Sequence, residues 1–217
     1  MNDTPAARVF FYEILPGDLR KLKAQSNEDP TQGGGARDIR FPDENFRRFM
    51  VKLFPTSAQS MKSTRARTSE NQGPADSTSN KVPVTVRTGK IYWYEENELK
   101  TTTVEYFPPT LSRPSEGRLA QIHKLVPLKE MMPEVPDGRL FLLLVQTTDG
   151  RVFPEYLDEA AIMARASKSP IQGAIARCIA KSDAATSGTK RGTGRVMGYA
   201  DFVPGSGRLT ESYCHEH

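Results

Sequence analysis

Arg139-Leu140-Phe141-Leu142-Leu143-Leu144-Val145-Gln146-Thr147-Thr148 is the most apolar segment of this 217-residue chain, and the rest of the expected fold can be built around it. Its six consecutive apolar residues do not alternate with polar ones, which predicts a strand that is buried on both faces. Asp149-Gly150 follows as a predicted hairpin turn, with residues 151–153 returning along the strand. We therefore expect residues 139–148 to form a fully buried strand of the sheet.

The N-terminal part of the chain predicts two more strands and the clearest helix. Residues 8–15 are β-branched and aromatic, and residues 36–41 form a second strand that ends at Pro42. Asp43 is predicted to be the N-cap of a helix that Pro55 ends. The helix is predicted because apolar residues recur at helical spacing and form one stripe, made of Phe46, Phe49, Met50 and Leu53.

Residues 56–81 differ in composition from everything around them. They contain no Val, Ile, Leu, Phe, Trp or Tyr, and they carry four basic and two acidic residues. Such a segment buries too little apolar surface to offset the entropy cost of ordering it. We therefore predict a long, disordered loop, inserted into the folded part of the chain.

The remaining elements complete an α+β pattern. Strands are predicted at 82–86, 90–94 and 99–107, with a tight connection at 87–89. Helices are predicted from Asp18 over 19–25, from Ser115 onward, and over 156–166 and 170–181. Because strands and helices do not alternate regularly, we expect one α+β domain, 1–181, with a mixed, partly closed sheet and flanking helices. Residues 182–217 are rich in Gly, Ser and Thr and are predicted to form a tail.

The cysteine content, the N-terminus and the apolar runs predict the cellular compartment of the protein. The two cysteines, Cys178 and Cys214, are too few for a disulfide framework, which favours a reducing compartment. The N-terminus lacks the pattern of a signal peptide, and the longest apolar run is far too short to span a membrane. We therefore expect a cytoplasmic protein without membrane contact. The net charge of +4 permits binding to a polyanion without requiring it.

Motifs for catalysis or cofactor binding are sparse. The glycine triplet at 33–35 lacks the Gly-Lys-Ser/Thr of a phosphate-binding loop, and no cofactor or metal is predicted. One alternative remains, a Mg²⁺-dependent nuclease in which Asp43, Glu98 and Lys100 supply the carboxylates and the lysine that such chemistry needs.

Basic residues cluster around the predicted loop and are the candidates for phosphate contacts. Arg and Lys in Ser/Thr-rich segments suit contacts to a nucleic-acid backbone, and a solvated loop with a slight basic bias is the alternative interpretation. The candidate DNA-binding residues are Arg37, Arg40, Lys62, Arg65, Arg67, Lys81, Arg87 and Lys90.

The order of several motifs is similar to that of a known family. These motifs are a first strand at Val9–Ile14, the glycines at 33–35, a strand at 36–41, a helix ending Lys52-Leu53-Phe54-Pro55, the strand Ile91-Tyr92-Trp93-Tyr94 and the apolar strand Leu140–Val145. Residues 8–155 thereby resemble the N-terminal effector-binding domain of EcoRII-type restriction endonucleases. The resemblance implies a DNA-binding pseudobarrel that serves a bacterial restriction or phage-defence system.

One segment departs from the family pattern. The family has a basic, sequence-reading segment after the Ile-Tyr strand, whereas residues 95–100 here are mostly acidic. DNA contacts are therefore expected instead from Arg37 and Arg40, at phosphate or a base edge, and from the 56–81 loop, where Lys62, Arg65 and Arg67 would clamp the backbone. We predict a non-enzymatic DNA-binding module. The nuclease and a protein-interaction subunit of a larger complex are the alternatives.

Overall fold

The computed structural model describes residues 5–18, 38–63, 81–109, 114–120, 136–186 and 195–215. The glycine triplet, the predicted helix at 19–25 and residues 64–80 of the predicted loop lie outside these ranges. Arg37, Arg65 and Arg67 lie outside them as well.

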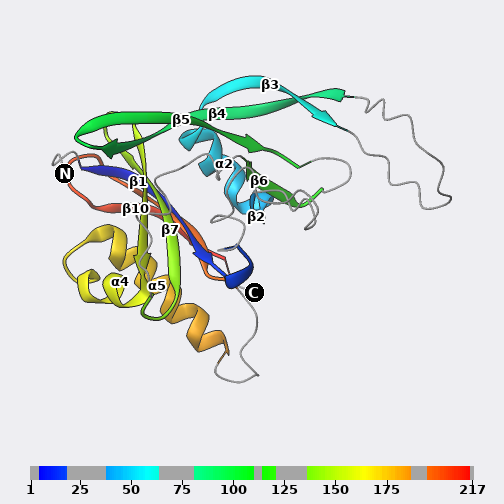
Figure 1. The fold of residues 1–217 in the computed structure, drawn as a ribbon. Helices are drawn as coiled ribbons and strands as arrows, with labels where there is room; N and C mark the ends of the chain where they lie inside the picture. Colours follow the sequence, from blue (N-terminus) through cyan, green and yellow to red (C-terminus); the bar gives the residue numbers. More distant parts are fainter. Residues whose placement is uncertain are drawn as a thin grey trace.

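The described strands form one curled, mixed sheet, which confirms the α+β class with a partly closed sheet (Figure 1). Its order is β10-β9-β1-β7-β8-β4-β5-β6-β2, and β3 pairs with β4 off this path. Neighbouring strands are antiparallel except β4 and β8, which are parallel. The bounds are Ala6–Ile14 (β1), Ile39–Pro42 (β2), Thr56–Ser63 (β3), Lys81–Glu95 (β4), Glu98–Phe107 (β5), Glu116–Ala120 (β6), Leu140–Thr147 (β7), Val152–Asp158 (β8), Met197–Phe202 (β9) and Leu209–Cys214 (β10).

Strands β1 and β7 form the centre of the buried sheet. They pair antiparallel from Ala6 and Thr147 to Ile14 and Leu140. Both predicted strands are confirmed, and β7 is buried on both of its faces as its unbroken apolar run requires.

Helix α2, Asp43–Leu53, lies on the inner side of the curled sheet (Figure 1). The predicted helix is confirmed, and its stripe of apolar side chains is fully buried. The ring of Phe46 meets Phe10 of β1 edge-on with centroids 5.8 Å apart, and Phe49 stacks on Tyr199 of β9 at 4.6 Å. Aromatic packing therefore joins α2 to strands from both ends of the chain.

The outer side of the sheet is covered by α4, Glu159–Arg165, and α5, Pro170–Thr186. Ile162 of α4 and Ile175 of α5 pack with Phe11 and Phe141 in a second apolar cluster. The Asp158 side chain caps α4 by accepting a hydrogen bond from the Ala161 N–H at 2.8 Å. The predicted helix at 156–166 therefore begins later than expected, because residues 156–158 belong to β8. Within the described residues, no helix is long and apolar enough to cross a bilayer.

The prediction of a C-terminal tail from residue 182 is wrong for most of the segment. Helix α5 continues to Thr186, β9 pairs with β1, and β10 pairs with β9. All six residues of β9 are buried. The segment as a whole is rich in small and polar residues, so its average composition does not reveal the apolar side chains of β9. Their burial also depends on pairing with β1, which is distant in sequence.

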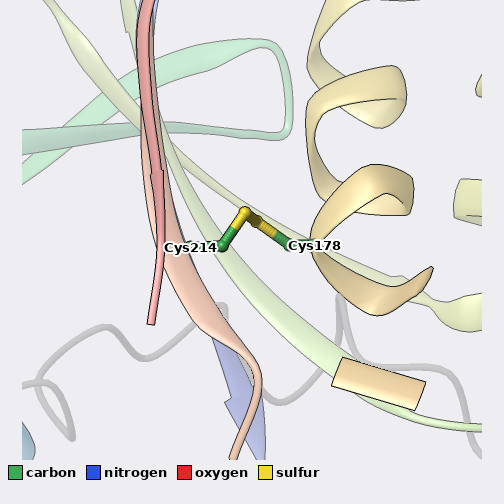
Figure 2. The surroundings of a disulfide bond; sticks show 2 residues. All are labelled: Cys178 and Cys214. Carbon is green, nitrogen blue, oxygen red and sulfur yellow. A yellow bond between two sulfur atoms is a disulfide. The ribbon is translucent and has the colours of Figure 1, made fainter. Parts of the chain in front are cut away.

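The expectation of reduced cysteines is also wrong. Cys178 of α5 and Cys214 of β10 form a disulfide, with their Cα atoms 5.4 Å apart (Figure 2). The bond connects a helix on the outer side to the edge strand of the sheet. A pairing of this kind depends on how α5 and β10 pack, which two isolated cysteines in a sequence do not reveal.

Three further predictions are corrected between residues 56 and 120. Residues 56–63 form β3 instead of part of a loop, and β4 runs unbroken through the connection predicted at 87–89. The helix predicted from Ser115 is replaced at 116–120 by β6, which pairs with β2 and β5; the rest of that predicted helix lies outside the described residues. In each case a strand partner distant in sequence overrides the local pattern.

Gly89 explains how β4 continues where a turn was expected. A Cβ atom at this position would meet Cδ1 of the buried Phe54 ring. The glycine therefore lets Phe54 lie directly against the strand, and it is needed for close packing rather than for a turn.

Candidate nucleic-acid interface

Strands β3 and β4 form a two-stranded antiparallel ribbon that extends beyond the rest of the sheet (Figure 1). The pairing runs from Thr56 opposite Thr88 to Ser63 opposite Lys81. Within the described residues β3 pairs with β4 alone.

The two faces of the ribbon differ in chemistry. On one face, Val86 is buried beside Phe107 and Ala120, with Ala58 and Val84 packed against them. The opposite face carries the hydrogen-bonding side chains Ser57, Gln59, Thr85 and Arg87, together with the exposed Pro83 of β4.

Hydrogen bonds order the polar face of the ribbon. The Gln59 amide donates to Thr85 Oγ1 across the strands at 3.0 Å, and Arg87 Nη1 donates to the Pro55 carbonyl at 2.9 Å. Gln59 and Thr85 are exposed, and Arg87 is half-buried. These side chains are held in place and keep further donors and acceptors directed to solvent.

Four of the predicted DNA-binding residues belong to this ribbon and its continuation. The register places Lys62 opposite Val82, one position from Lys81, and Arg87 and Lys90 follow along β4. Within the described residues, neither Arg87 nor Lys90 has an acidic partner. The structure therefore brings half of the predicted set onto one strand pair.

Other basic residues form ion pairs within the protein. Arg40 lies on β2, three strands from β4 in the sheet order, and pairs with Glu116 at 3.6 Å. Arg118 pairs with Asp38 at 3.0 Å, and Arg139 pairs with Asp183 at 2.7 Å. Arg40 is therefore separated from the ribbon, and its charge is partly compensated.

Gln59 and Thr85 are candidate site residues that the sequence did not single out. The sequence of β3 carries no large branched or aromatic residue that would reveal its alternation, so it has the composition of a loop. The signal in the sequence is that every second residue of 57–59 and 85–87 is polar, and it has meaning only once the two segments are known to pair.

The geometry of the ribbon suits the major groove of DNA. The groove admits a two-stranded β-ribbon, and such ribbons read base edges with side chains from one face. Arginine pairs with guanine, glutamine with adenine, and threonine with either base. One face of the ribbon thus carries three residue types whose side chains can hydrogen-bond to base edges.

The alternative nuclease trio is not assembled. Asp43 is not the helix N-cap as predicted: Pro42 holds that position, and Asp43 lies in the first turn with its side chain 1% exposed. Asp43 accepts a hydrogen bond from the Tyr106 hydroxyl and another from Arg47 Nε at 2.6 Å. Burial, and then the bond to Asp43, raise the pKa of Tyr106 well above its usual range. The carboxylate therefore anchors α2 to β5.

Glu98 and Lys100 lie at the other end of β5 from Tyr106. They form an ion pair with each other on the exposed hairpin. Eight residues of extended chain separate Glu98 from Tyr106, which corresponds to roughly 27 Å. Across the described parts of the chain, His, Cys, Asp and Glu form no group of three or more that could hold a metal ion.

Comparison of the chain with protein-family models, with curated proteins and with solved structures found no significant match. The resemblance to EcoRII-type domains therefore stays a prediction.

Proposed function

We propose that this chain is a non-enzymatic DNA-binding module that inserts the β3–β4 ribbon into the major groove. The observation that carries the proposal is the exposed polar face of the ribbon, where Gln59, Thr85 and Arg87 lie beside one another. A buried apolar cluster on the opposite face holds the ribbon against β5 and β6. The polar face is thereby presented by a fixed support, as base readout requires.

Base contacts and phosphate contacts have separate sources in this proposal. Gln59, Thr85 and Arg87 contact base edges, and Lys62, Lys81 and Lys90 contact phosphates on either side of the groove. Arg65 and Arg67 follow β3 in sequence and are proposed to add phosphate contacts, as is Arg37. Of the candidate DNA-binding residues, Arg40 is the least favoured for a DNA contact, because it pairs with Glu116 away from the ribbon.

The biological setting is also a proposal. The motif order that resembles EcoRII-type domains supports a recognition or regulatory role in a restriction or phage-defence system. A cytoplasmic location is proposed because DNA is encountered there. Disulfides are rare in that compartment, so this location requires the Cys178–Cys214 bond to resist cytoplasmic thiols or to form transiently.

The test is duplex binding at two salt concentrations with matched variants. We expect a gel shift with mixed duplexes that weakens steeply between about 50 and 200 mM salt, because phosphate contacts release counterions. Lys90→Ala should lower the salt slope by about 1 for all sequences. Lys168→Ala removes an exposed lysine from the turn before α5, a helix that packs against β1, β7 and β9 instead of the ribbon, and it should leave the gel shift unchanged.

Base readout is tested with a duplex selected from a random pool. Gln59→Ala and Arg87→Ala should each weaken binding to the selected duplex by about 1–3 kcal/mol while leaving non-specific binding nearly unchanged. Absence of a gel shift, or a shift that salt does not weaken, would exclude the proposed mode. Equal losses of affinity on all duplexes would mean that the ribbon contacts phosphates and does not read bases.

A further inference from the structure

A cleft lies between the turn that precedes α5, the first turns of α5 and the hairpin that joins β9 to β10. Its walls are residues 166–170, Gly173 and Arg177 on one side and Phe202 and Leu209 on the other. The cleft encloses about 290 Å³, close to the lower end of the roughly 300–1,000 Å³ that is typical of ligand pockets. A small molecule therefore fits this site, and the proposed DNA contact at the ribbon does not use it.

Two basic side chains line the cleft, Lys168 from the turn and Arg177 from α5. Within the described residues, neither side chain has an acidic partner. The Arg177 guanidinium lies back along the helix toward the turn, because its Nη1 atom is 3.7 Å from the point where a Cβ atom on Gly173 would lie. Two positive charges that no carboxylate compensates therefore border the same cleft.

The surroundings of the cleft lack acidic residues. Residues 160–182 contain four basic residues and no Asp or Glu. The acidic residues of the two strands that form the other wall, Asp201 and Glu211, bind Lys52 of α2 on the inner side of the sheet. Phe202, in contrast, packs in the cluster on the outer side, where α4 and α5 lie. The electrostatic potential at the cleft is therefore positive, which favours an anionic ligand.

Apolar side chains form the rest of the lining, namely Pro170, Phe202 and Leu209. Phe202 is buried, whereas Leu209 is 37% exposed and is one of four exposed large hydrophobic side chains among the described residues. A ligand that covered Leu209 would remove apolar surface from water, which is favourable. The cleft thus places an apolar wall beside two cations, and this combination suits an anion that carries an apolar group.

Two contacts hold the walls of the cleft at a fixed separation. The Cys178–Cys214 disulfide connects α5, which carries Arg177, to β10 (Figure 2). A Cβ atom on Gly207 of the β9–β10 hairpin would lie 3.0 Å from Cγ of Pro170, so the hairpin packs closely on the start of α5. A site with fixed walls loses little conformational freedom when a ligand binds.

We propose that this cleft binds a small phosphate monoester that carries an aryl or alkyl group. A phosphate monoester has close to two negative charges near neutral pH and three acceptor oxygens. Lys168 and Arg177 match the two charges, and the hydroxyls of Ser167 and Ser169, which also line the cleft, supply further donors. The apolar group of the ligand lies against Leu209. A carboxylate or a DNA phosphodiester has a single charge and matches the pair of cations less well. This binding is independent of DNA binding by the ribbon.

A titration of the ¹⁵N-labelled full chain with phenyl phosphate, followed by NMR, tests the proposal. We expect saturable shifts of the Ser169 and Gly173 amide signals, with a dissociation constant in the millimolar range or below. Inorganic phosphate lacks the apolar group and benzoate has one charge, so both should bind more weakly. Benzyl alcohol, which has no charge, should not bind in the cleft.

Variants separate the charged and the apolar contributions. Lys168→Ala and Arg177→Ala should each weaken phenyl phosphate binding by about two- to fivefold, and together by about tenfold, as expected for exposed ion pairs. Leu209→Ala should weaken phenyl phosphate binding by about two- to fivefold and leave inorganic phosphate binding unchanged. Arg48→Ala on α2 and Leu99→Ala on β5 remove an exposed arginine and an exposed leucine elsewhere and should have no effect. Thermal unfolding checks that every variant is folded.

Four outcomes would overturn the proposal. One is the absence of a saturable shift up to about 20 mM phenyl phosphate. The second is wild-type affinity in the Lys168→Ala, Arg177→Ala double variant. The third is benzyl alcohol or inorganic phosphate binding as tightly as phenyl phosphate. The fourth is displacement of phenyl phosphate from the cleft by duplex DNA, which would assign the cleft to the DNA backbone.

Discussion

The two halves of strand β4 lie in contrasting environments. Residues 81–88 pair with β3 in the ribbon, where Thr85 is exposed on one face and Val86 is buried in a small apolar cluster on the other. Residues 89–95 lie between β5 and β8, where Ile91 is fully buried in the main core. The same hydrogen-bonded strand therefore packs on a small apolar cluster and presents an exposed polar face in one half, and it reaches the main core in the other.

The contrast teaches that pairing and burial are separate contributions to this fold. Backbone pairing is continuous along β4, whereas the strand reaches the main core only at Ile91, and Val86 is buried in a separate, smaller cluster. Substitutions in the sheet half should therefore change stability, and substitutions in the ribbon half should change binding.

The largest expected effect is on stability in the sheet half. Ile91→Ala removes a fully buried side chain and should lower the free energy of unfolding by about 2–5 kcal/mol, because it leaves a cavity in the main core. Thr85→Ala, on the same strand but in the ribbon, should stay within about 0.5 kcal/mol. Urea unfolding of both variants measures the difference. Equal losses would contradict the division of β4.

The next largest effect on stability is expected from the disulfide, which connects α5 to β10 and lies outside the ribbon. Replacing Cys178 and Cys214 by serine frees a loop closed over 36 residues, and the unfolded chain gains conformational freedom. We expect a loss of about 2–4 kcal/mol in urea unfolding. Duplex binding at a temperature where the variant stays folded should be unchanged, because β10 and β4 are five strands apart in the sheet order. A stability equal to that of the wild type would show that the bond constrains little.

The boundary between the two halves can be tested at Gly89. Gly89→Ala places a methyl group against the Phe54 ring and should cost about 1–3 kcal/mol, since the buried ring has little freedom to move. Gly17→Ala is the matched control, because a Cβ there meets nothing within 4 Å. Thermal unfolding of the two variants compares them. A neutral Gly89→Ala would mean that the ring shifts readily.

The sequence predicted those elements whose apolar period is local. Strands β1, β5 and β7 and helix α2 have patterns that stand out within a few residues, and all four are found. The apolar stripe of α2 even identified the side chains that fill the inner core. In these segments, local preference and tertiary packing agree.

The elements that were missed depend on distant partners. Strand β3 has the composition of a loop and becomes a strand by pairing with β4, and β9 becomes core by pairing with β1. The candidate interface follows the same rule: Lys62, Lys81, Arg87 and Lys90 were found by charge, but Gln59 and Thr85 acquire meaning only from the register. Side chains of ordinary composition carry no signal until the strands that align them are known.

The smallest effect is the pH dependence contributed by a buried charge. Glu13 of β1 is buried and accepts a hydrogen bond from the Val196 N–H at 2.7 Å. Burial raises its pKa above the ordinary 4.5, although the Val196 bond opposes the shift. The folded protein therefore holds this proton more tightly than the unfolded chain does. The stabilisation is complete below pH 4.5 and is lost as the pH rises through the folded pKa.

Glu13→Gln keeps an acceptor for Val196 and removes the ionisable group. Relative to wild type, the variant should gain stability as the pH rises from about 4 to 8, measured by urea unfolding. Glu159→Gln provides the opposite sign, because hydrogen bonding to Arg139 lowers the pKa of Glu159. That variant should lose stability relative to wild type over the same range, because ionised Glu159 stabilises the fold above the ordinary 4.5. If the stability difference between each variant and the wild type did not change with pH, burial at Glu13 and pairing at Glu159 would have no energetic consequence.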